Sequence, residues 1–220
     1  MLPLFLLPGM GGDARMFEPQ LAALPGATVP AWIQPEPSEG LPSFAARMAK
    51  VVDPGGPCFV GGASFGGMVA VEMARHLQAR ACFLIGSVRS PAELPPRTRV
   101  FRWLGHWTGA HGLELAPRAA AVLHGLAGRW FSPAVGSLTR QLADTDREFF
   151  RWAALAVLQW TPSPGPLPVP ILQVHGDRDH MLPHQYTRPD VLVRGAGHLL
   201  SMSHRDEVNQ FLRAGMEKYG

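Results

Sequence analysis

Short apolar runs that end at glycine or at another turn residue recur along the chain, with longer amphipathic segments between them. Apolar runs of about four to eight residues bounded by glycine or proline are typical of buried strands. The strand candidates of this kind are residues 3–9, 57–63, 81–87, 169–176 and 190–197, together with 27–33 as a weaker one.

Apolar residues recur at helical spacing in the segments between these runs. The expected helices are residues 13–24, 43–52, 66–79, 144–160 and 203–219. Asp13, Ser43 and Asp144 stand where a helix N-cap belongs, and either Ser203 or Asp206 can cap the last helix. Strands that alternate with helices in this way predict an α/β fold, in which helices cover both faces of a mostly parallel sheet.

The alternation breaks between about residues 91 and 143, which contain no convincing strand run. We expect this part to be a helical insertion after the strand at 81–87, within a single domain of residues 1–220. A proline-rich segment, residues 161–170, then connects the helix at 144–160 to the next strand.

Composition places the chain among globular proteins. Apolar residues make up 46% of the 220 positions and charged residues 17%, which argues against disorder. The 20 basic and 17 acidic side chains give a formal net charge of +3. Since no run is rich in lysine and arginine, this charge is too small to indicate nucleic-acid binding.

The apolar runs are also too short for a membrane protein, because none approaches the roughly 18 residues that a membrane span requires. The apolar N-terminus lacks the basic region of a signal peptide, so a cytoplasmic location is expected. Cys58 and Cys82 both lie in strand-like runs, and we expect two buried thiols rather than a disulfide.

Candidate chemistry begins at the G-x-S-x-G sequence Gly62-Ala63-Ser64-Phe65-Gly66, between a predicted strand and a predicted helix. In this context the motif is typical of a nucleophile elbow, where a sharp turn exposes the serine hydroxyl above the sheet. Small neighbours are needed because the backbones of the strand, turn and helix nearly touch. Glycine-rich turns are common, so the pentapeptide alone also fits a plain strand-to-helix turn.

A serine hydroxyl needs a base to become a nucleophile, and the base needs an orienting carboxylate. Among the nine histidines, His198 is the best placed, because it follows the last predicted strand at the sheet edge where catalytic groups collect. The loop after the strand at 169–176 offers Asp177 and Asp179 as the acid. We favour Asp179, since Asp177 is better suited to cap the turn.

Two N–H groups are needed to stabilise the oxyanion of an acyl-transfer intermediate. We expect one from the backbone of Phe65 and the other from that of Met10, in the glycine-rich loop after the first strand. This loop can also be an ordinary turn into the helix capped by Asp13. It does not match the glycine patterns that bind phosphate, and neither a cofactor nor a metal is expected.

Five of the six tryptophans fall between residues 89 and 160. Trp103, Trp107 and Trp130 lie in the insertion and are candidates for contacts with an apolar or aromatic part of a substrate. They can equally form the core of the insertion itself. Residues 89–143 also carry seven arginines against two glutamates, which indicates either a solvated helical face or a positive surface that attracts anionic substrates.

The segments "LLPGMGG", "GGASFGG", "HGDRDHMLP" and "GAGHLL", in this order, resemble the α/β-hydrolase superfamily. The resemblance covers about two thirds of the chain and is nearest to small bacterial esterases and thioesterases with a helical cap. It implies Ser64 as nucleophile, Asp179 as acid and His198 as base. The chain begins at what resembles the family's third strand, so a reduced sheet of about six strands is expected. Pro8 stands where many members have histidine.

Together these features predict a serine hydrolase that cleaves carboxylic esters through an acyl-enzyme intermediate. A thioesterase acting on acyl-CoA or carrier-protein substrates is the alternative, and the arginine excess favours an anionic leaving group of that kind. A protein that binds a ligand on the same scaffold without catalysis is a third hypothesis, although such proteins usually lose the histidine or the acid. The expected partner is a small-molecule ester or thioester.

Overall fold

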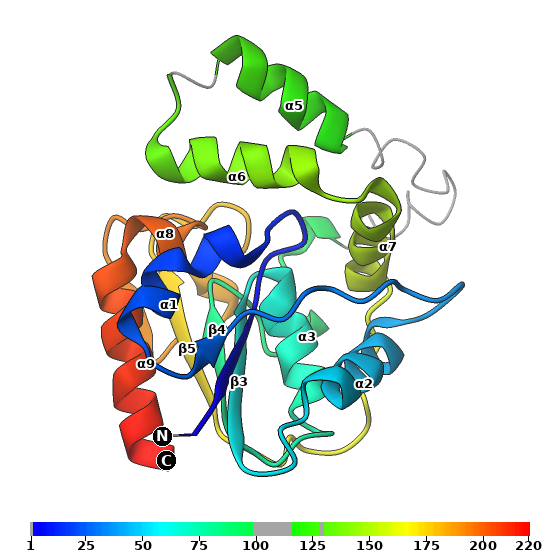
Figure 1. Ribbon diagram of the computed structural model, residues 1–220, viewed down its shortest axis with the longest axis vertical. Coiled ribbons are helices and arrows are strands. Elements are labelled where there is room, and N and C mark those ends of the chain that lie inside the picture. Colours follow the sequence, from blue (N-terminus) through cyan, green and yellow to red (C-terminus); the bar gives the residue numbers. More distant parts are fainter. Residues whose placement is uncertain (1, 99–115, 128–129) are drawn as a thin grey trace.

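Parallel strands form a sheet at the centre of the structure (Figure 1). The computed structural model describes residues 2–98, 116–127 and 130–220. Within them, the six strands are β1 (Leu4–Leu7), β2 (Ala27–Thr28), β3 (Cys58–Ala63), β4 (Ala79–Ile85), β5 (Ile171–Gly176) and β6 (Val191–Val193). Their order is β2-β1-β3-β4-β5-β6, and every neighbouring pair is parallel. The predicted α/β fold with a reduced parallel sheet is thus confirmed.

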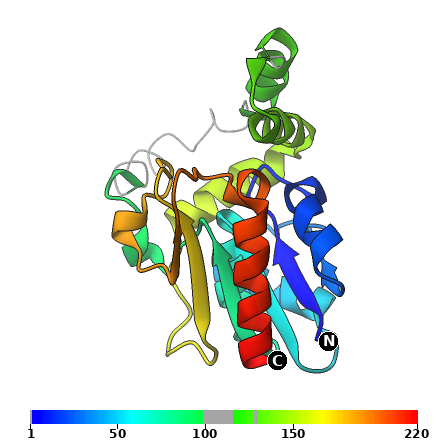
Figure 2. The same cartoon turned by 90° about the vertical axis from the view of Figure 1, so that its left-hand side faces the viewer.

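Helices cover both faces of this sheet, as Figures 1 and 2 show. One face carries η1 (Ala14–Phe17), α1 (Glu18–Ala23), α8 (Leu200–Ser203) and α9 (Arg205–Tyr219). The other face carries α2 (Leu41–Val52), α3 (Phe65–Met73) and α7 (Arg147–Leu158). The three-layer arrangement follows from strands that are apolar on both sides.

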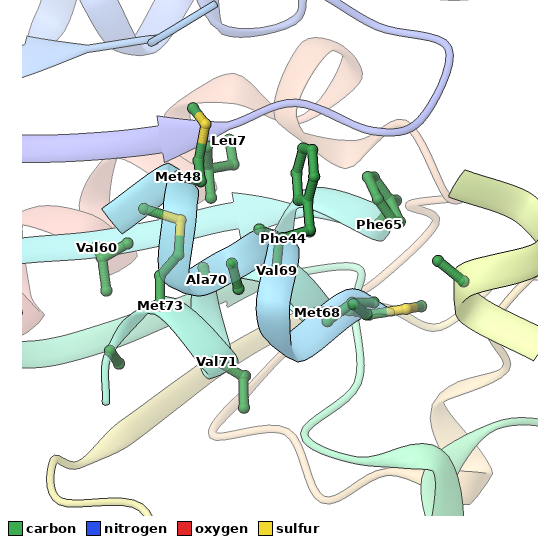
Figure 3. Packing of buried hydrophobic residues seen from close by; sticks show 14 of the residues in the cluster. Leu7, Phe44, Met48, Val60, Phe65, Met68, Val69, Ala70, Val71 and Met73 are labelled. Carbon is green, nitrogen blue, oxygen red and sulfur yellow. The ribbon is translucent and has the colours of Figure 1, made fainter. Parts of the chain in front are cut away.

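Side chains along β4 show how one strand serves two cores. Phe83 and Ile85 pack in the cluster that includes α1 and α9, whereas Cys82 and Leu84 pack in the cluster that includes α2 and α3. This division follows from the two-residue period of a strand, which sends successive side chains to opposite faces. Figure 3 shows the second cluster, in which Phe65 lies at the start of α3 close to the α2 side chains.

The segment after β4 leaves the sheet and forms helices above the carboxyl ends of the strands (Figure 1). Its described elements are η2 (Pro91–Glu93), α5 (Ala116–Ala127) and α6 (Pro133–Asp144). The helices α5 and α6 pack together, with His124 Nδ1 and Thr139 Oγ1 2.8 Å apart. Because α6 also contacts η1, it lies over the loop that follows β1.

Several element boundaries differ from the sequence-based expectation. The weak strand expected over 27–33 is only two residues long, because Pro30 cannot donate a backbone hydrogen bond to a neighbouring strand. The helix expected over 66–79 ends at Met73, since Ala79 already pairs with Cys58 and the chain needs the intervening residues to turn back.

The predicted capping residues of two later helices are also wrong. Asp144 ends α6, and Asp146 instead caps α7 by accepting a hydrogen bond of 2.8 Å from the Phe149 N–H. The last helix begins at neither predicted cap, because a short turn, α8, comes first and His204 is the N-cap residue of α9.

Two further expectations concern the whole chain. Cys58 and Cys82 are buried free thiols, as predicted. None of the helices in the described ranges combines the length and apolar character needed to cross a membrane.

Candidate active site

The candidate site lies where the order of the strands reverses, between β1 and β3. The chain continues from β1 outward to β2 and then returns to place β3 on the other side of β1. Loops at the carboxyl ends of β1 and β3 therefore diverge, and such a crevice is where open α/β sheets bind their ligands. The loop with Met10 follows β1, and Ser64 follows β3.

Ser64 occupies a strained turn between β3 and α3. Its backbone has φ 51° and ψ −120°, in a region that residues with a side chain rarely adopt. Glycines on both sides make this turn possible: a Cβ on Gly66 would lie 2.1 Å from the Leu7 carbonyl oxygen, and one on Gly62 would lie 2.4 Å from the Gly66 carbonyl carbon. The predicted close approach of strand, turn and helix is confirmed.

Two hydrogen bonds brace this turn against the neighbouring strand. The Ser64 N–H donates to the Ile85 carbonyl at 3.1 Å, and the buried Ser87 hydroxyl donates to the Ser64 carbonyl at 2.6 Å. Sequence reasoning missed Ser87, since a lone serine after a strand carries no signal of this contact. Its effect is to hold the Ser64 backbone in a conformation that it would not otherwise favour.

His198 lies between Ser64 and Asp179, the residues named with it from the sequence. Its Nε2 is 2.9 Å from Ser64 Oγ, and its Nδ1 is 2.7 Å from Asp179 Oδ2. An ionised carboxylate can only accept hydrogen bonds, so Nδ1 carries the proton and Nε2 is left to accept one from the serine hydroxyl. The geometry therefore suits transfer of the Ser64 proton to His198.

Asp179 is 2% exposed, yet its carboxylate is well supplied with donors. Oδ1 accepts hydrogen bonds of 2.9 Å from the Met181 and Leu182 N–H groups. Burial raises the pKa of Asp179, but contacts with His175 and His198 and the bond from Leu182 outweigh burial and hold this pKa well below its usual range. Asp179 thus stays ionised at neutral pH.

Asp177, the other acid considered from the sequence, connects the loop after β5 to the turn after β6. Its Oδ1 accepts a hydrogen bond of 2.7 Å from the Gly195 N–H. The contact with His198 is made by Asp179 and not by Asp177. The structure therefore brings Asp179, and not Asp177, to His198.

The backbone groups expected to form an oxyanion hole lie on either side of Ser64. Phe65 is the first residue of α3, and the N–H groups of a first helical turn have no partner within the helix. Met10 sits in a tight turn closed by a hydrogen bond of 2.9 Å from the Gly12 N–H to the Gly9 carbonyl. Met10 lines the cavity beside Ser64, and the helix terminus at Phe65 favours negative charge near Ser64.

An apolar cavity of about 200 Å³ opens beside Ser64 and His198. Apolar side chains from four parts of the chain line it, among them Met16, Leu138, Leu142, Phe150, Met181 and Leu199. A larger cavity of about 560 Å³ lies between α1 and α9, near the chain termini, but its described lining includes no serine, cysteine or histidine. The smaller cavity is therefore the candidate substrate site.

The helix α6 is tied to the loop that holds Met10. Buried Gln141 accepts a hydrogen bond of 3.0 Å from the Asp13 N–H, and Arg15 lies 2.5 Å from Asp13 and 2.7 Å from Asp144. A Cβ on Gly11 would lie 2.6 Å from Leu142 Cδ1. These contacts, which sequence reasoning did not foresee, fix the Met10 loop against the insertion.

Of the three tryptophans expected to contact substrate, the structure describes Trp130 alone. Trp103 and Trp107 lie outside the described residues, and Trp130 is 76% exposed and is not among the residues that line the cavity. Trp152 and Trp160 instead belong to the packing around α7, where their Nε1 groups donate to the Glu39 carbonyl and the Glu72 carboxylate.

His175 also lies next to Asp179, although sequence reasoning placed it only at the end of a strand. It is fully buried, and its Nε2 lies 3.3 Å from Asp179 Oδ2, the oxygen that also contacts His198. Within the described ranges, no group of three or more histidine, cysteine or acidic side chains has the arrangement of a metal site.

The family model described as "Alpha/beta hydrolase family" matches residues 4–211. The chain belongs to the alpha/beta hydrolase family. No protein among the curated sequences matches it.

Solved structures of other family members share the fold of this hydrolase. A thermophilic esterase from Thermogutta terrifontis is 20% identical, with a TM-score of 0.74 over 100% of this chain and 90% of that chain. An enol-lactonase from Burkholderia xenovorans is 20% identical, with a TM-score of 0.70 over 99% and 92%. The N-acyl homoserine lactonase AidH is 20% identical, with a TM-score of 0.66 over 98% and 89%. At these identities the likeness establishes the fold alone.

Proposed function

We propose that this hydrolase cleaves carboxylic esters, with Ser64 as nucleophile, His198 as base and Asp179 as the orienting acid. The observation that carries the proposal is the continuous chain of contacts from Asp179 Oδ2 through His198 to Ser64 Oγ, at 2.7 and 2.9 Å, beside an apolar cavity. Nucleophilic catalysis requires a nucleophile, a base within hydrogen-bond reach of it and a third group that orients the base.

The proposed reaction has two halves. In the first, Ser64 Oγ bonds to the ester carbonyl carbon while its proton passes to His198 Nε2, and the N–H groups of Met10 and Phe65 stabilise the oxyanion. His198 then gives the proton to the leaving alkoxide as the ester C–O bond breaks. In the second half, His198 takes a proton from water, the hydroxide attacks the acyl-enzyme, and Ser64 leaves with the proton from His198.

Asp179 contributes through its permanent charge. Since its pKa is held well below the usual range, it remains an acceptor over the pH range in which His198 must change protonation. It therefore fixes the proton on His198 Nδ1 and stabilises the imidazolium that forms during attack. The proposal accordingly assigns it orientation and charge stabilisation rather than proton transfer.

The cavity supports a substrate with a small or medium apolar acyl group. Its volume is about 200 Å³, and the described side chains that line it are mostly methionine, leucine and phenylalanine. No arginine belongs to this described lining. Two of the arginines that suggested an anionic leaving group have other partners: Arg89 lies near Glu93 and Asp190, and Arg97 donates to backbone carbonyls. These observations favour a neutral ester over a thioester with an anionic carrier.

Hydrolysis of p-nitrophenyl acetate, butyrate and octanoate by the wild type and single variants tests the proposal. We expect the highest kcat/KM with butyrate, and a fall of about 10³-fold or more in kcat for Ser64→Ala and His198→Ala. Ser43→Ala and His76→Ala are matched controls, because both side chains are exposed and neither residue lines the cavity.

Two results would contradict the proposal. Turnover that survives in Ser64→Ala would remove the assigned nucleophile. A wild type without turnover that is also not labelled by a fluorophosphonate would favour the hypothesis of a ligand-binding protein on this scaffold.

A further inference from the structure

The side chain of His175, near the end of β5, is held in one protonation state by its surroundings. Its Nε2 lies 2.6 Å from the Leu182 carbonyl oxygen, which can only accept, so the proton resides on Nε2. Its Nδ1 is buried and has no hydrogen-bond partner. A second proton there would place an unpaired donor and a charge in the interior, which is costly. His175 is therefore neutral and presents its Nε2–H edge.

This edge also faces the carboxylate of Asp179. The distance from His175 Nε2 to Asp179 Oδ2 is 3.3 Å, and Oδ2 is the oxygen that accepts from His198. Leu182 connects the same two residues a second time, because its N–H donates to Asp179 Oδ1 and its carbonyl accepts from His175. The loop of residues 179–182 is thus fastened to β5 through one imidazole.

Two other charged or titratable side chains, His198 and Arg97, lie near this loop. His198 is the other titratable side chain that contacts the Asp179 carboxylate within the described residues. Arg97, in the segment after β4, donates to the carbonyls of His180 and Met181 at 2.5 and 2.6 Å, on the outer side of the loop. After β4, a Cβ on Gly86 would lie 3.6 Å from Asp179 Oδ2, but glycine offers no side chain there.

We propose that His175 is a positioning residue for the ester-cleaving site: it fixes the Asp179 carboxylate toward His198 and shares the negative charge of Oδ2. This inference rests on the proposed function, because it assigns Asp179 as the partner of the catalytic base. A donor that withdraws charge from a carboxylate lowers its basicity. His175 therefore moderates how strongly Asp179 holds the imidazolium of His198.

The inference predicts a specific effect of removing the donor. His175→Leu removes the ring N–H that lies beside Asp179 Oδ2 and the Leu182 carbonyl. We expect kcat to fall about tenfold with KM within about twofold, because the acid is misplaced while the cavity is unchanged. The acid limb of the kcat/KM profile reports the coupled Asp179–His198 pair, and we expect it to move upward by about half a pH unit or more.

His175→Gln is the rescue variant, because the amide nitrogen of glutamine can occupy the position of Nε2, donate to the Leu182 carbonyl and lie beside Asp179 Oδ2. We expect it to restore kcat to within about twofold and to return the acid limb to the position found in the wild type. His180→Leu and His180→Gln are matched controls on the same loop, since the side chain of His180 is exposed. If His175→Leu does not fold, His175→Asn serves in its place, because the shorter amide cannot reach the acceptors.

The titration of the coupled pair is followed in each variant by NMR of the His198 ring, which requires no turnover. The inference would be overturned if His175→Leu lowers the free energy of unfolding but leaves the pH profile of kcat/KM and the midpoint of the His198 NMR titration unchanged. His175 would then have only a packing role. A midpoint that moves in His175→Leu and returns in His175→Gln would support it. A wild type without turnover or labelling would overturn the proposed function, and the NMR comparison would still decide the role of His175.

Discussion

Substitution of Gly66 by alanine tests whether the turn at Ser64 depends on the contact between β1 and α3. Gly66 is the second residue of α3, and it packs directly on the carboxyl end of β1. An added Cβ would lie 2.1 Å from the Leu7 carbonyl oxygen and 2.3 Å from that of Pro8. Both atoms belong to the backbone, so a rotation of a side chain cannot relieve the overlap.

The size of the disturbance follows from these distances. Real Cβ contacts essentially never fall below 3.0 Å, so a contact of 2.1 Å requires β1 and α3 to separate locally by about 0.9 Å. Overpacking of this kind typically costs about 1–3 kcal/mol of folding free energy. The displaced end of β1 leads into the Met10 loop, while α3 carries Ser64 and Phe65. A misplacement of about 1 Å in an active site can cost about 10²-fold in rate.

We therefore expect Gly66→Ala to fold with a free energy of unfolding lower by about 1–3 kcal/mol and with kcat for p-nitrophenyl butyrate reduced by about 10²-fold. Urea denaturation and steady-state kinetics measure the two effects. Gly125→Ala is the control, because a Cβ there meets nothing within 4 Å in α5, and we expect stability to rise by up to about 1 kcal/mol. Wild-type kcat and stability in Gly66→Ala would refute the reasoning.

Three further predictions concern groups around this site and in the core. Burial raises the pKa of Cys58 to about 11 and that of Cys82 to about 12, so we expect no reaction with DTNB at pH 8 until guanidinium unfolds the chain. Gln141→Leu leaves the Asp13 N–H without its acceptor, and we expect a loss of about 1–3 kcal/mol in urea denaturation with a lower kcat. The pKa of Asp179 is lowered in the folded state, so the ionised carboxylate stabilises the fold above about pH 4, and this stabilisation is lost as pH falls below that value. We therefore expect the difference in free energy of unfolding between wild type and Asp179→Asn to narrow below about pH 4. A difference that stays constant with pH would contradict this.

Much of the fold could be predicted because the strands are short apolar runs that end at turn residues. Their spacing indicated a parallel sheet, and the chain order of Ser64, Asp179 and His198 placed three polar groups at one sheet edge. The structure brings these three together at hydrogen-bond distances. These three residues could be singled out from local sequence because each of them follows a recognisable strand.

The supporting residues could not be predicted in the same way. Gln141 bonds to a group 128 positions away, and it lies on an amphipathic helix where a glutamine would normally face solvent. Ser87 bonds to Ser64 across 23 positions through the packing of β4 against the elbow. Such contacts depend on how elements pack, which no local pattern encodes. His175 is the exception, because its spacing of four residues from Asp179 is visible in the sequence.

The boundaries of helices were the least predictable feature. Asp144 and Asp146 are both suitable N-cap residues in the sequence, and only the packing of α6 over η1 decides that the first ends one helix and the second begins the next. The composition of the tryptophan-rich insertion likewise left open whether its tryptophans contact a substrate or form its own core, and Trp103 and Trp107 lie outside the described residues. The described cavity is lined mostly by leucine, methionine and phenylalanine side chains.

Labelling with a fluorophosphonate, followed by peptide mass spectrometry, tests the central claim most directly. The reagent reacts with a serine hydroxyl only where a neighbouring base activates it. We predict one adduct per chain, on Ser64, that is lost in His198→Ala and retained in His76→Ala. An adduct on another serine, or an unlabelled wild type, would contradict the account.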